Sequence, residues 1–187
     1  MLTRRQFLVR SAATLAAAGA AYRLAIPVAR AANSIDRDSV KVIQFDDAGK
    51  KIGPAVVKKV RKTDEEWMKQ LSAIQYQVTR KEGTERAFTG EYYNLHDKGL
   101  YRCICCGNAL FSSDTKFESG TGWPSFWAPI AHENVRDSSD TSLGMVRSAV
   151  SCSECDAHLG HVFNDGPEPT GLRYCMNSAA LKFIKRA

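Results

Sequence analysis

The sequence predicts a mainly β fold of the α+β class, with small antiparallel β-sheets preceded by short helices. From residue 91 onward, glycine and proline recur every few residues and separate short aromatic and β-branched runs. This texture is typical of short antiparallel strands joined by turns. Helix-capping signals lie before this region, between residues 63 and 83. We therefore expect the short helices to lead into a β domain.

Residues 1–31 predict an export signal that precedes the folded domain. Residues 3–8 (TRRQFL) match the twin-arginine pattern, and an alanine-rich stretch and small residues follow. The apolar stretch is interrupted by Arg23 and is shorter than the roughly 20 residues that span a bilayer. We expect cleavage after Ala31 or Ala32 and a periplasmic or otherwise exported protein without a stable membrane anchor. An uncleaved or amphipathic N-terminal anchor is the alternative.

Net charge argues against a nucleic-acid partner. The 187-residue chain carries a formal charge of +6, but five arginines and no acidic residue lie in residues 1–31. The mature chain is therefore close to neutral. Nucleic-acid binding rests on the neutralisation of phosphates by basic side chains, so this balance gives it little support. The remaining length of about 155 residues suits one domain.

The first expected elements are a lead-in and a short helix. Residues 32–59 are polar and weakly patterned, and we expect an extended lead-in there. Thr63 and Glu66 then form a capping box, in which the Thr63 hydroxyl accepts from the Glu66 N–H and the Glu66 carboxylate reaches back. The apolar residues that helical spacing places on one face are Trp67, Leu71 and Ile74.

A second helix and several strands follow. The helix is expected over residues 72–82 and ends at Gly83, a residue suited to the left-handed position after a helix. In the β region, the best strand candidates are residues 145–150 and 180–184, which are rich in apolar and β-branched side chains.

Two Cys-x-x-Cys motifs, Cys103/Cys106 and Cys152/Cys155, lie in the β region. Each such turn points two thiolates at one centre, and two turns supply the four sulfur ligands of a tetrahedral Zn²⁺ site. With all ligands from the protein, we expect one structural zinc ion. Two alternatives remain. Six cysteines in an exported chain can pair as disulfides, and a redox Cys-x-x-Cys is possible, although it usually begins a helix within a βαβ pattern.

Cys175 lies outside the two motifs and is a candidate nucleophile. A lone cysteine is more often a small buried apolar residue. Arg173, however, shares a face with it if this segment is a strand, and could favour the reactive thiolate. His158 and His161 follow the second motif closely, and an imidazole titrates near neutral pH, as proton transfer requires. The alternative for either histidine is a hydrogen bond to the backbone.

Trp123 stands in an unusual segment, residues 120–127 (GTGWPSFW). Glycines around an aromatic residue, followed by proline, suit a rigid loop that presents an indole face. Packing in the core is the simpler role for Trp123. The alternative is an apolar wall for a small thioether-like substrate.

Together these segments resemble the B-type methionine sulfoxide reductases, which act on the R epimer of methionine sulfoxide. The resemblance covers residues 60–185, and its ordered combination of motifs is highly specific. The matching pieces are residues 83–90 (GTERAFTG), Cys103/Cys106, residues 119–126 (SGTGWPSF), 155–163 (CDAHLGHVF) and 169–178 (PTGLRYCMNS). The resemblance implies that residues 60–187 form the reductase domain, a small mainly β fold with its substrate pocket beside the last strands.

The resemblance also implies residue roles. Cys175 would attack the sulfoxide sulfur and become a sulfenic acid as methionine is released. The residues implied to bind the sulfoxide oxygen, deliver a proton and arrange the site are His158, His161, Asn177 and Arg173. The residues implied to bind the substrate are Trp123, which contacts its methyl group, and Phe163.

One position departs from the family pattern. Many members carry a cysteine between the glycines of the Gly-x-Gly-Trp-Pro segment, where it attacks the sulfenic acid, whereas this chain has Thr121. Cys105 is the remaining spare cysteine, but it lies inside a zinc motif. We therefore expect an external reductant, either a thioredoxin-like protein or a low-molecular-weight thiol. The expected substrate is oxidised methionine, free or in exported proteins.

Two other functional classes stay open on the residues alone. A zinc-ribbon-like binding module would explain the four motif cysteines but leaves Cys175 and the two histidines without a role. A disulfide-stapled structural protein of the cell envelope would use the cysteines differently. Metal content and free thiols distinguish this second class from a zinc protein.

Overall fold

A computed structural model of the chain describes residues 38–140 and 147–186. The export signal predicted at residues 1–31 lies outside the described residues, as does its cleavage site. No helix in the described part of the chain has the length and apolar character needed to cross a membrane.

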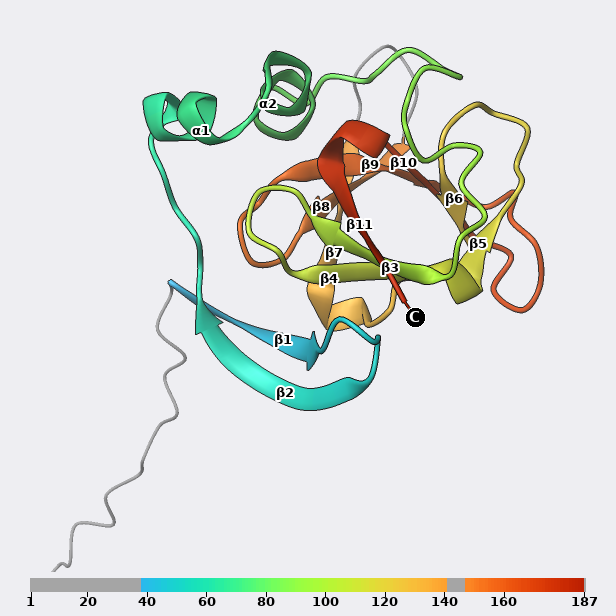
Figure 1. Cartoon of the computed structure of the whole chain (residues 1–187), viewed down its shortest axis with the longest axis horizontal. Helices are drawn as coiled ribbons and strands as arrows, with labels where there is room; N and C mark the ends of the chain where they lie inside the picture. The colour runs from blue at the N-terminus through green and yellow to red at the C-terminus, as the bar shows by residue number, and fades with distance from the viewer. Residues whose placement is uncertain (1–37, 141–146, 187) are drawn as a thin grey trace, which may run out of the picture. The chain divides into compact units, whose positions relative to one another are not determined.

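The mainly β fold is confirmed: within the described residues, three antiparallel sheets are accompanied by two α-helices (Figure 1). The six-stranded sheet has the order β5 (Lys116–Phe117), β6 (Ser125–Phe126), β10 (Arg173–Met176), β9 (His158–Phe163), β8 (Arg147–Cys152) and β7 (Val135–Asp140). The three-stranded sheet has the order β11 (Leu181–Lys185), β3 (Gly99–Cys103) and β4 (Ala109–Ser112). The two-stranded sheet pairs β1 (Ser39–Phe45) with β2 (Lys51–Lys58).

The two predicted strands correspond to β8 and β11, with ends shifted by one or two residues. Residues 145–146 of the first prediction lie outside the described residues. Short 3₁₀ turns complete the fold: η1 (Ser113–Thr115), η2 (His132–Asn134) and η4 (Ser178–Ala180).

The first helix, α1 (Asp64–Gln70), begins with the predicted capping box. Glu66 N donates to the Thr63 hydroxyl at 3.3 Å, and Thr63 N donates to the Glu66 carboxylate at 2.8 Å. Trp67 and Leu71 are buried as expected, but Ile74 is 51% exposed, so its predicted place on this face is wrong. The reason is that α1 ends at Gln70, with Leu71 as its C-cap, and Ile74 belongs to the next helix.

The second helix, α2 (Ala73–Arg80), has a capping box of its own formed by Ser72 and Gln75. Its end differs from the prediction in detail. Glu82 takes the left-handed conformation with a φ of 56°, and the Gly83 N–H closes the helix end by donating to the Gln77 carbonyl at 2.9 Å. The left-handed residue is therefore Glu82, one residue before the glycine that was predicted to take this conformation.

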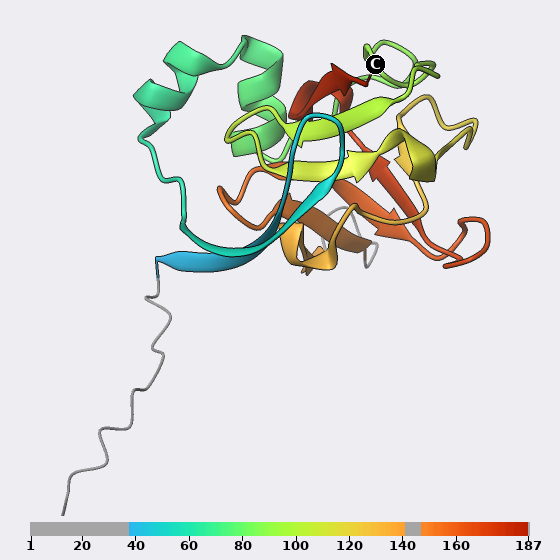
Figure 2. The ribbon, with the colours of Figure 1, turned by 60° about the horizontal axis from the view of Figure 1, so that its bottom comes forward.

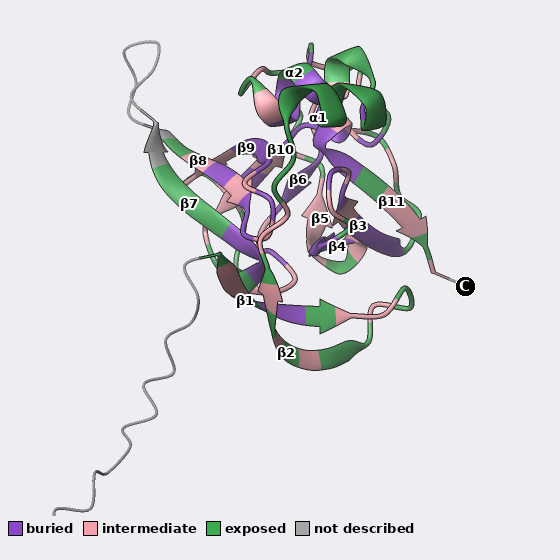
Figure 3. Ribbon diagram, turned by 90° about the vertical axis from the view of Figure 1, so that its left-hand side faces the viewer, coloured by how far each residue is buried: buried purple, intermediate pink, exposed green. Residues whose placement is uncertain are grey.

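The expected extended lead-in over residues 32–59 is corrected by the structure: its described part is the β1–β2 hairpin (Figure 2). Val42 and Ile43 of β1 are buried, whereas Ile52 and Val56 of β2 are exposed. Pro54 also interrupts the hydrogen-bonding pattern expected of a strand. Figure 3 shows a buried stretch in β1 and only exposed or intermediate residues in β2. Exposed apolar residues and an internal proline hide the period-2 signal, so the sequence did not predict a hairpin.

Asn134, at the end of η2, attaches this hairpin to the domain. Its side chain is fully buried and makes three hydrogen bonds: Nδ2 donates to the carbonyls of Ile43 and Ala109 at 2.8 Å each, and Oδ1 accepts from Ile43 N at 2.7 Å. One amide therefore satisfies backbone groups of both β1 and β4, which would otherwise be buried without partners.

Replacing Asn134 with leucine is expected to lower the free energy of unfolding by about 3 kcal/mol. The change removes the partner of three buried backbone groups, and each unsatisfied group costs roughly 1–3 kcal/mol, although relaxation of the hairpin recovers part of this. Urea unfolding monitored by tryptophan fluorescence measures the effect. The exposed surface variant Ser148→Ala serves as control. Equal stability of the two variants would contradict the attachment of the hairpin by Asn134.

The core lies between the three-stranded and six-stranded sheets and is largely aromatic. The Phe126 ring of β6 stacks on Phe111 of β4 at 4.5 Å and contacts Tyr101 of β3 edge-on at 5.0 Å. In β10, Tyr174 and Met176 point into this core, while Arg173 and Cys175 face the other side with intermediate burial. This alternation turns Cys175 away from the core and onto the opposite face of the sheet.

Candidate active site and metal centre

The two Cys-x-x-Cys motifs form matching turns. In the first, Gly107 N donates to the Cys103 carbonyl at 2.9 Å; in the second, Asp156 N donates to the Cys152 carbonyl at the same distance. Both residues after the turns have left-handed backbone, with φ of 83° at Gly107 and 57° at Asp156. Glycine adopts this conformation freely, and aspartate tolerates it better than most residues do.

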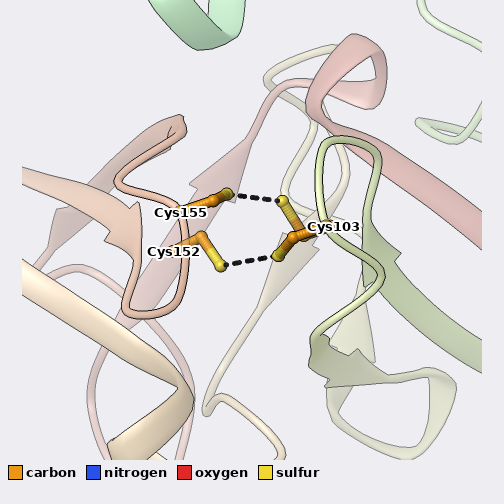
Figure 4. A group of neighbouring side chains, drawn as sticks. Cys103, Cys152 and Cys155 are labelled. Carbon is orange, nitrogen blue, oxygen red and sulfur yellow. Dashed lines mark hydrogen bonds between the residues drawn. The ribbon is translucent and has the colours of Figure 1, made fainter. Parts of the chain in front are cut away.

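The four sulfur atoms form one cluster between the turns (Figure 4). All lie within 4.8 Å of one another, with 3.6 Å between Cys103 and Cys155 and 3.6 Å between Cys106 and Cys152. A disulfide needs about 2.05 Å, so these distances do not correspond to covalent pairs. In a regular tetrahedron, metal–sulfur bonds of about 2.3 Å place the sulfur atoms about 3.8 Å from one another. The cluster therefore fits a tetrahedral metal ion.

Electrostatics also favour a cation at this centre. Contacts with the neighbouring cysteines, with burial, raise the pKa of the Cys103 thiol well above its usual value. Four thiolates held this close together repel one another, and a divalent cation removes that penalty by binding them. Outside the four sulfurs, Asn108 Nδ2 donates to Cys152 Sγ at 3.6 Å and to the Asn134 carbonyl at 3.1 Å. Asn134, which attaches the β1–β2 hairpin, is thus linked through Asn108 to the four-cysteine cluster.

Cys175 lies in a row of facing side chains across three neighbouring strands. It pairs with Ser125 on β6 and with His161 on β9, and paired residues of antiparallel strands project from the same face. Two residues earlier on β10, Arg173 pairs with Phe163 of β9. The strand register therefore gathers the predicted nucleophile, one histidine, the arginine and the phenylalanine on one face of the sheet.

A bulge in β9 places both histidines together. His158 and His161 are three residues apart, so a regular strand would point them to opposite faces. The register with β8 shifts between Val150 and Ser151, which leaves one extra residue, Leu159, in β9. The two imidazole rings consequently lie 5.2 Å apart in an edge-to-face arrangement.

Gly160, between the histidines, allows β9 and β10 to approach closely beside the nucleophile. Its φ is 159°, and a Cβ at this position would lie 2.1 Å from the Cys175 carbonyl oxygen and 2.9 Å from Met176 Cα. Both neighbours are backbone atoms of β10 that cannot move aside easily. A side chain at Gly160 would therefore displace the strand that carries Cys175.

Cys175 opens into a small pocket of about 130 Å³. Trp123 and Phe163 supply its aromatic wall, and its complete lining is Thr84, Trp123, Gly160, His161, Phe163, Cys175, Met176 and Asn177. Trp123 is only partly buried, so it is a wall residue and not a core residue. His161 lines the pocket, while His158 is buried behind it. A pocket this small suits the end of a side chain.

Asn177 and Glu85 form a buried network that positions the pocket walls. Asn177 Oδ1 accepts from Glu85 N at 3.0 Å, and Nδ2 donates to the Leu159 carbonyl at 3.0 Å. The Glu85 carbonyl accepts from Trp123 Nε1 at 3.1 Å, which orients the indole. Asn177 therefore lines the pocket, while the two polar atoms of its amide form hydrogen bonds with the backbone at Glu85 and Leu159.

Arg173 is held beside Cys175 by two contacts. Its guanidinium makes paired hydrogen bonds of 2.8 Å to both carboxylate oxygens of Asp165 and lies over the Phe163 ring at 4.3 Å. Burial raises the pKa of the Cys175 thiol, whereas the Thr121 hydroxyl, the Arg173 charge and the Ser125 hydroxyl act to lower it. Arg173 thus favours the thiolate as expected, but burial outweighs this effect.

Comparison with known proteins identifies the family. The SelR domain model matches residues 71–185, more than half of the chain. A peptide methionine sulfoxide reductase MsrB from Hahella chejuensis is 59% identical over 125 residues, which cover 67% of this chain and 90% of the relative. The MsrB from Leptospira interrogans is 59% identical over 126 residues, covering 67% of this chain and 96% of the relative. The chain belongs to the MsrB family. The MsrB from Thiobacillus denitrificans is similarly close, at 59% over 122 residues.

Within this MsrB fold, the structure adds residues that the sequence interpretation did not assign. Glu85 accepts hydrogen bonds from the N–H groups of Ser178 and Ala179 at 2.6 and 2.8 Å, and Asp165 holds Arg173. Glu85 stands in a matched motif, so its presence was visible, but its buried partners were not. Asp165 gave no sequence signal, because only the turn after β9 brings it back to β10.

Proposed function

We propose that this chain reduces the R epimer of methionine sulfoxide to methionine, with Cys175 as the nucleophile. The observation that carries the proposal is the position of Cys175 in a small aromatic pocket beside His161, on a fold shared with the MsrB family. The thioether end of an oxidised methionine side chain suits a pocket of this size. Trp123 and Phe163 then bind its methyl group and neighbouring carbons.

In the proposed reaction, the Cys175 thiolate attacks the sulfoxide sulfur while the sulfoxide oxygen is protonated. His161 is the group that donates this proton, because it lines the pocket and pairs with Cys175 across the strands. His158 acts as a positioning residue behind it, in ring contact at 5.2 Å. The hydroxyl group then moves from the substrate sulfur to the Cys175 sulfur as the bond between the two sulfur atoms breaks. Cys175 is thereby oxidised to a sulfenic acid, and methionine leaves with its sulfur reduced by two electrons.

Regeneration of Cys175 is assigned to an external thiol. A first thiol condenses with the sulfenic acid to form a mixed disulfide and water, and a second thiol releases Cys175 by disulfide exchange. Thr121 lies 3.8 Å from Cys175 Sγ and has no thiol to offer. Cys105 is buried in the first Cys-x-x-Cys turn, and its backbone carbonyl accepts a hydrogen bond from Gln70 Nε2 at 2.7 Å. A thioredoxin-like protein or a small thiol is the proposed reductant.

The metal proposed for the four-cysteine centre is one structural zinc ion. Cys103, Cys106, Cys152 and Cys155 would hold it, and a closed set of four thiolates leaves no open position for substrate. When bound, zinc supplies a crosslink between the turn after β3 and the turn after β8. Because β9 begins shortly after the second turn, this crosslink positions the strand that carries His161.

Export through the twin-arginine route remains a proposal that rests on residues 1–31. It would deliver the folded, metal-loaded domain to oxidised methionine in exported proteins. Fractionation of cells that produce the full chain tests this proposal, with Arg4 and Arg5 both replaced by lysine as control. Accumulation of both forms in the cytoplasm would contradict it.

The reaction is tested by turnover of the separate R and S epimers of methionine sulfoxide with dithiothreitol as reductant. We expect activity on the R epimer alone, measured as methionine released. Equal turnover of both epimers, or turnover of neither by folded and metal-loaded protein, would exclude the proposed reaction.

Replacing Thr121 with cysteine is expected to create an internal resolving thiol. The introduced sulfur lies on the residue whose hydroxyl contacts Cys175, so it can attack the sulfenic acid and form a disulfide with release of water. Mass spectrometry after one turnover without reductant measures this product. The unmodified chain is the control: a Cys105–Cys175 disulfide there would contradict external reduction.

A further inference from the structure

Three hydroxyl side chains form a continuous hydrogen-bond chain that ends at Cys175. The Ser119 hydroxyl lies 2.7 Å from that of Ser125 and 2.8 Å from that of Thr121, and Thr121 Oγ1 lies 3.8 Å from Cys175 Sγ. At its other end, Ser125 Oγ lies 3.2 Å from the Trp123 carbonyl oxygen. None of these three residues has a role in the proposed reaction so far.

This chain of hydroxyls is built into the fold. Ser125 is fully buried on β6 and pairs directly with Cys175 on β10. Thr121 lies in the loop before β6, between two glycines with φ of 71° and 85° that allow its tight turn. Thr121 N also lies 3.4 Å from the Ser119 hydroxyl, which accepts this bond whatever the direction of the chain.

Counting hydrogens determines how the chain is oriented when Cys175 is ionised. A thiolate carries no hydrogen, so the Thr121 hydroxyl must donate to it. The only hydroxyl hydrogen of Thr121 is then used, and Ser119 must donate to Thr121. By the same reasoning, Ser125 donates to Ser119. All three dipoles then point towards the negative sulfur.

The opposite orientation satisfies the neutral thiol. Cys175 S–H donates to Thr121, Thr121 donates to Ser119, and Ser119 donates to Ser125. Ser125 in turn donates to the Trp123 carbonyl at 3.2 Å. In this neutral state every hydroxyl has a donor and an acceptor. In the thiolate state Ser125 donates to Ser119 in place of the Trp123 carbonyl. The two states differ only by rotation of the three hydroxyl groups.

We propose that Ser119, Thr121 and Ser125 form a reversible hydroxyl chain that changes direction with the ionisation state of Cys175 and stabilises the thiolate inside the pocket. Thr121 contacts the reacting sulfur and is thus a catalytic residue, while Ser119 and Ser125 are positioning residues. When Cys175 ionises, its proton leaves to water and no O–H bond of the chain is broken. The importance of the chain for turnover rests on the proposed reductase function; its effect on the thiol does not.

Other charged and titratable groups face Cys175 as well. Arg173 lies on the same strand as Cys175, is paired with Asp165 and favours the thiolate. His161 faces Cys175 from β9, and His158 lies behind it. Of the groups that lower the pKa of Cys175, the Thr121 hydroxyl contributes most, which supports its place at the end of the chain. Because these other groups stay in place, variants of the chain test its effect separately.

The test is the pH dependence of Cys175 alkylation by iodoacetamide, followed by mass spectrometry of the Cys175 peptide. In Thr121→Val, which keeps the side-chain shape, we expect the midpoint of the profile to rise and the rate at pH 7 to fall about threefold to tenfold. Ser119→Ala is expected to shift the midpoint in the same direction by less. Thr121→Ser, which restores the hydroxyl, and Thr170→Val, an exposed control, should match the unmodified chain.

A profile of Thr121→Val that coincides with that of the unmodified chain would overturn the proposal. A shift of the alkylation midpoint in Thr121→Val with no shift in Ser119→Ala would also overturn it. Such a result would show that the single contact between Thr121 and Cys175 is sufficient without the chain. Equal thermal stabilities establish that the variants are folded. The assay needs no sulfoxide, so a failure of the proposed reductase reaction is detected separately, in the epimer assay.

Discussion

Replacing Cys175 with serine is expected to lower turnover of methionine R-sulfoxide by about a thousandfold or more. A serine hydroxyl remains protonated at neutral pH and cannot accept oxygen to form a sulfenic acid. The surroundings should change little, because Cys175 is partly exposed and its strand is held by backbone pairing with β6 and β9. Steady-state release of methionine with dithiothreitol measures the loss.

The matched control is Cys105→Ser, which changes the other cysteine outside the metal cluster. We expect this variant to retain turnover with dithiothreitol. Loss of activity in Cys105→Ser with full activity in Cys175→Ser would reverse the assignment of the nucleophile. Residual turnover of Cys175→Ser within tenfold of the unmodified chain would also contradict it.

Removing one metal ligand is expected to have the second large effect, this time on stability. Binding of zinc to four thiolates contributes about 10 kcal/mol or more of apparent free energy to folded structural sites. Cys106→Ser removes one of these ligands, so we expect loss of bound zinc and a large drop in the midpoint of thermal unfolding. Metal analysis by mass spectrometry and thermal unfolding by circular dichroism measure both changes.

The neighbouring residue again supplies the control. Cys105 is adjacent to Cys106 in sequence and more deeply buried, yet only Cys106 belongs to the four-sulfur cluster. Cys105→Ser should therefore keep about one zinc per chain. If Cys106→Ser also retained its zinc and its unfolding temperature, the four-thiolate centre would be wrong.

Local signals in the sequence predicted local structure well. The capping box at Thr63 appears with both of its hydrogen bonds, because a cap involves residues only three apart. The hairpin at β1–β2 was missed for the opposite reason. One of its attachments is the Asn134 side chain, which lies 91 residues from Ile43 in the chain. No local pattern reports such a partner.

The sequence by itself determined the chemistry available to this protein: two pairs of thiols, a separate cysteine, two histidines and the motifs of the MsrB family. Ligand spacing within a turn and the types of reactive side chain are local properties, so they can be read directly from residue order. The tertiary structure decided which of these groups meet. A single extra residue in β9 puts His158 and His161 on one face, and the pairing of β10 with β6 brings Ser125 to Cys175. Strand register depends on packing between distant segments, and for that reason only the folded chain reveals it.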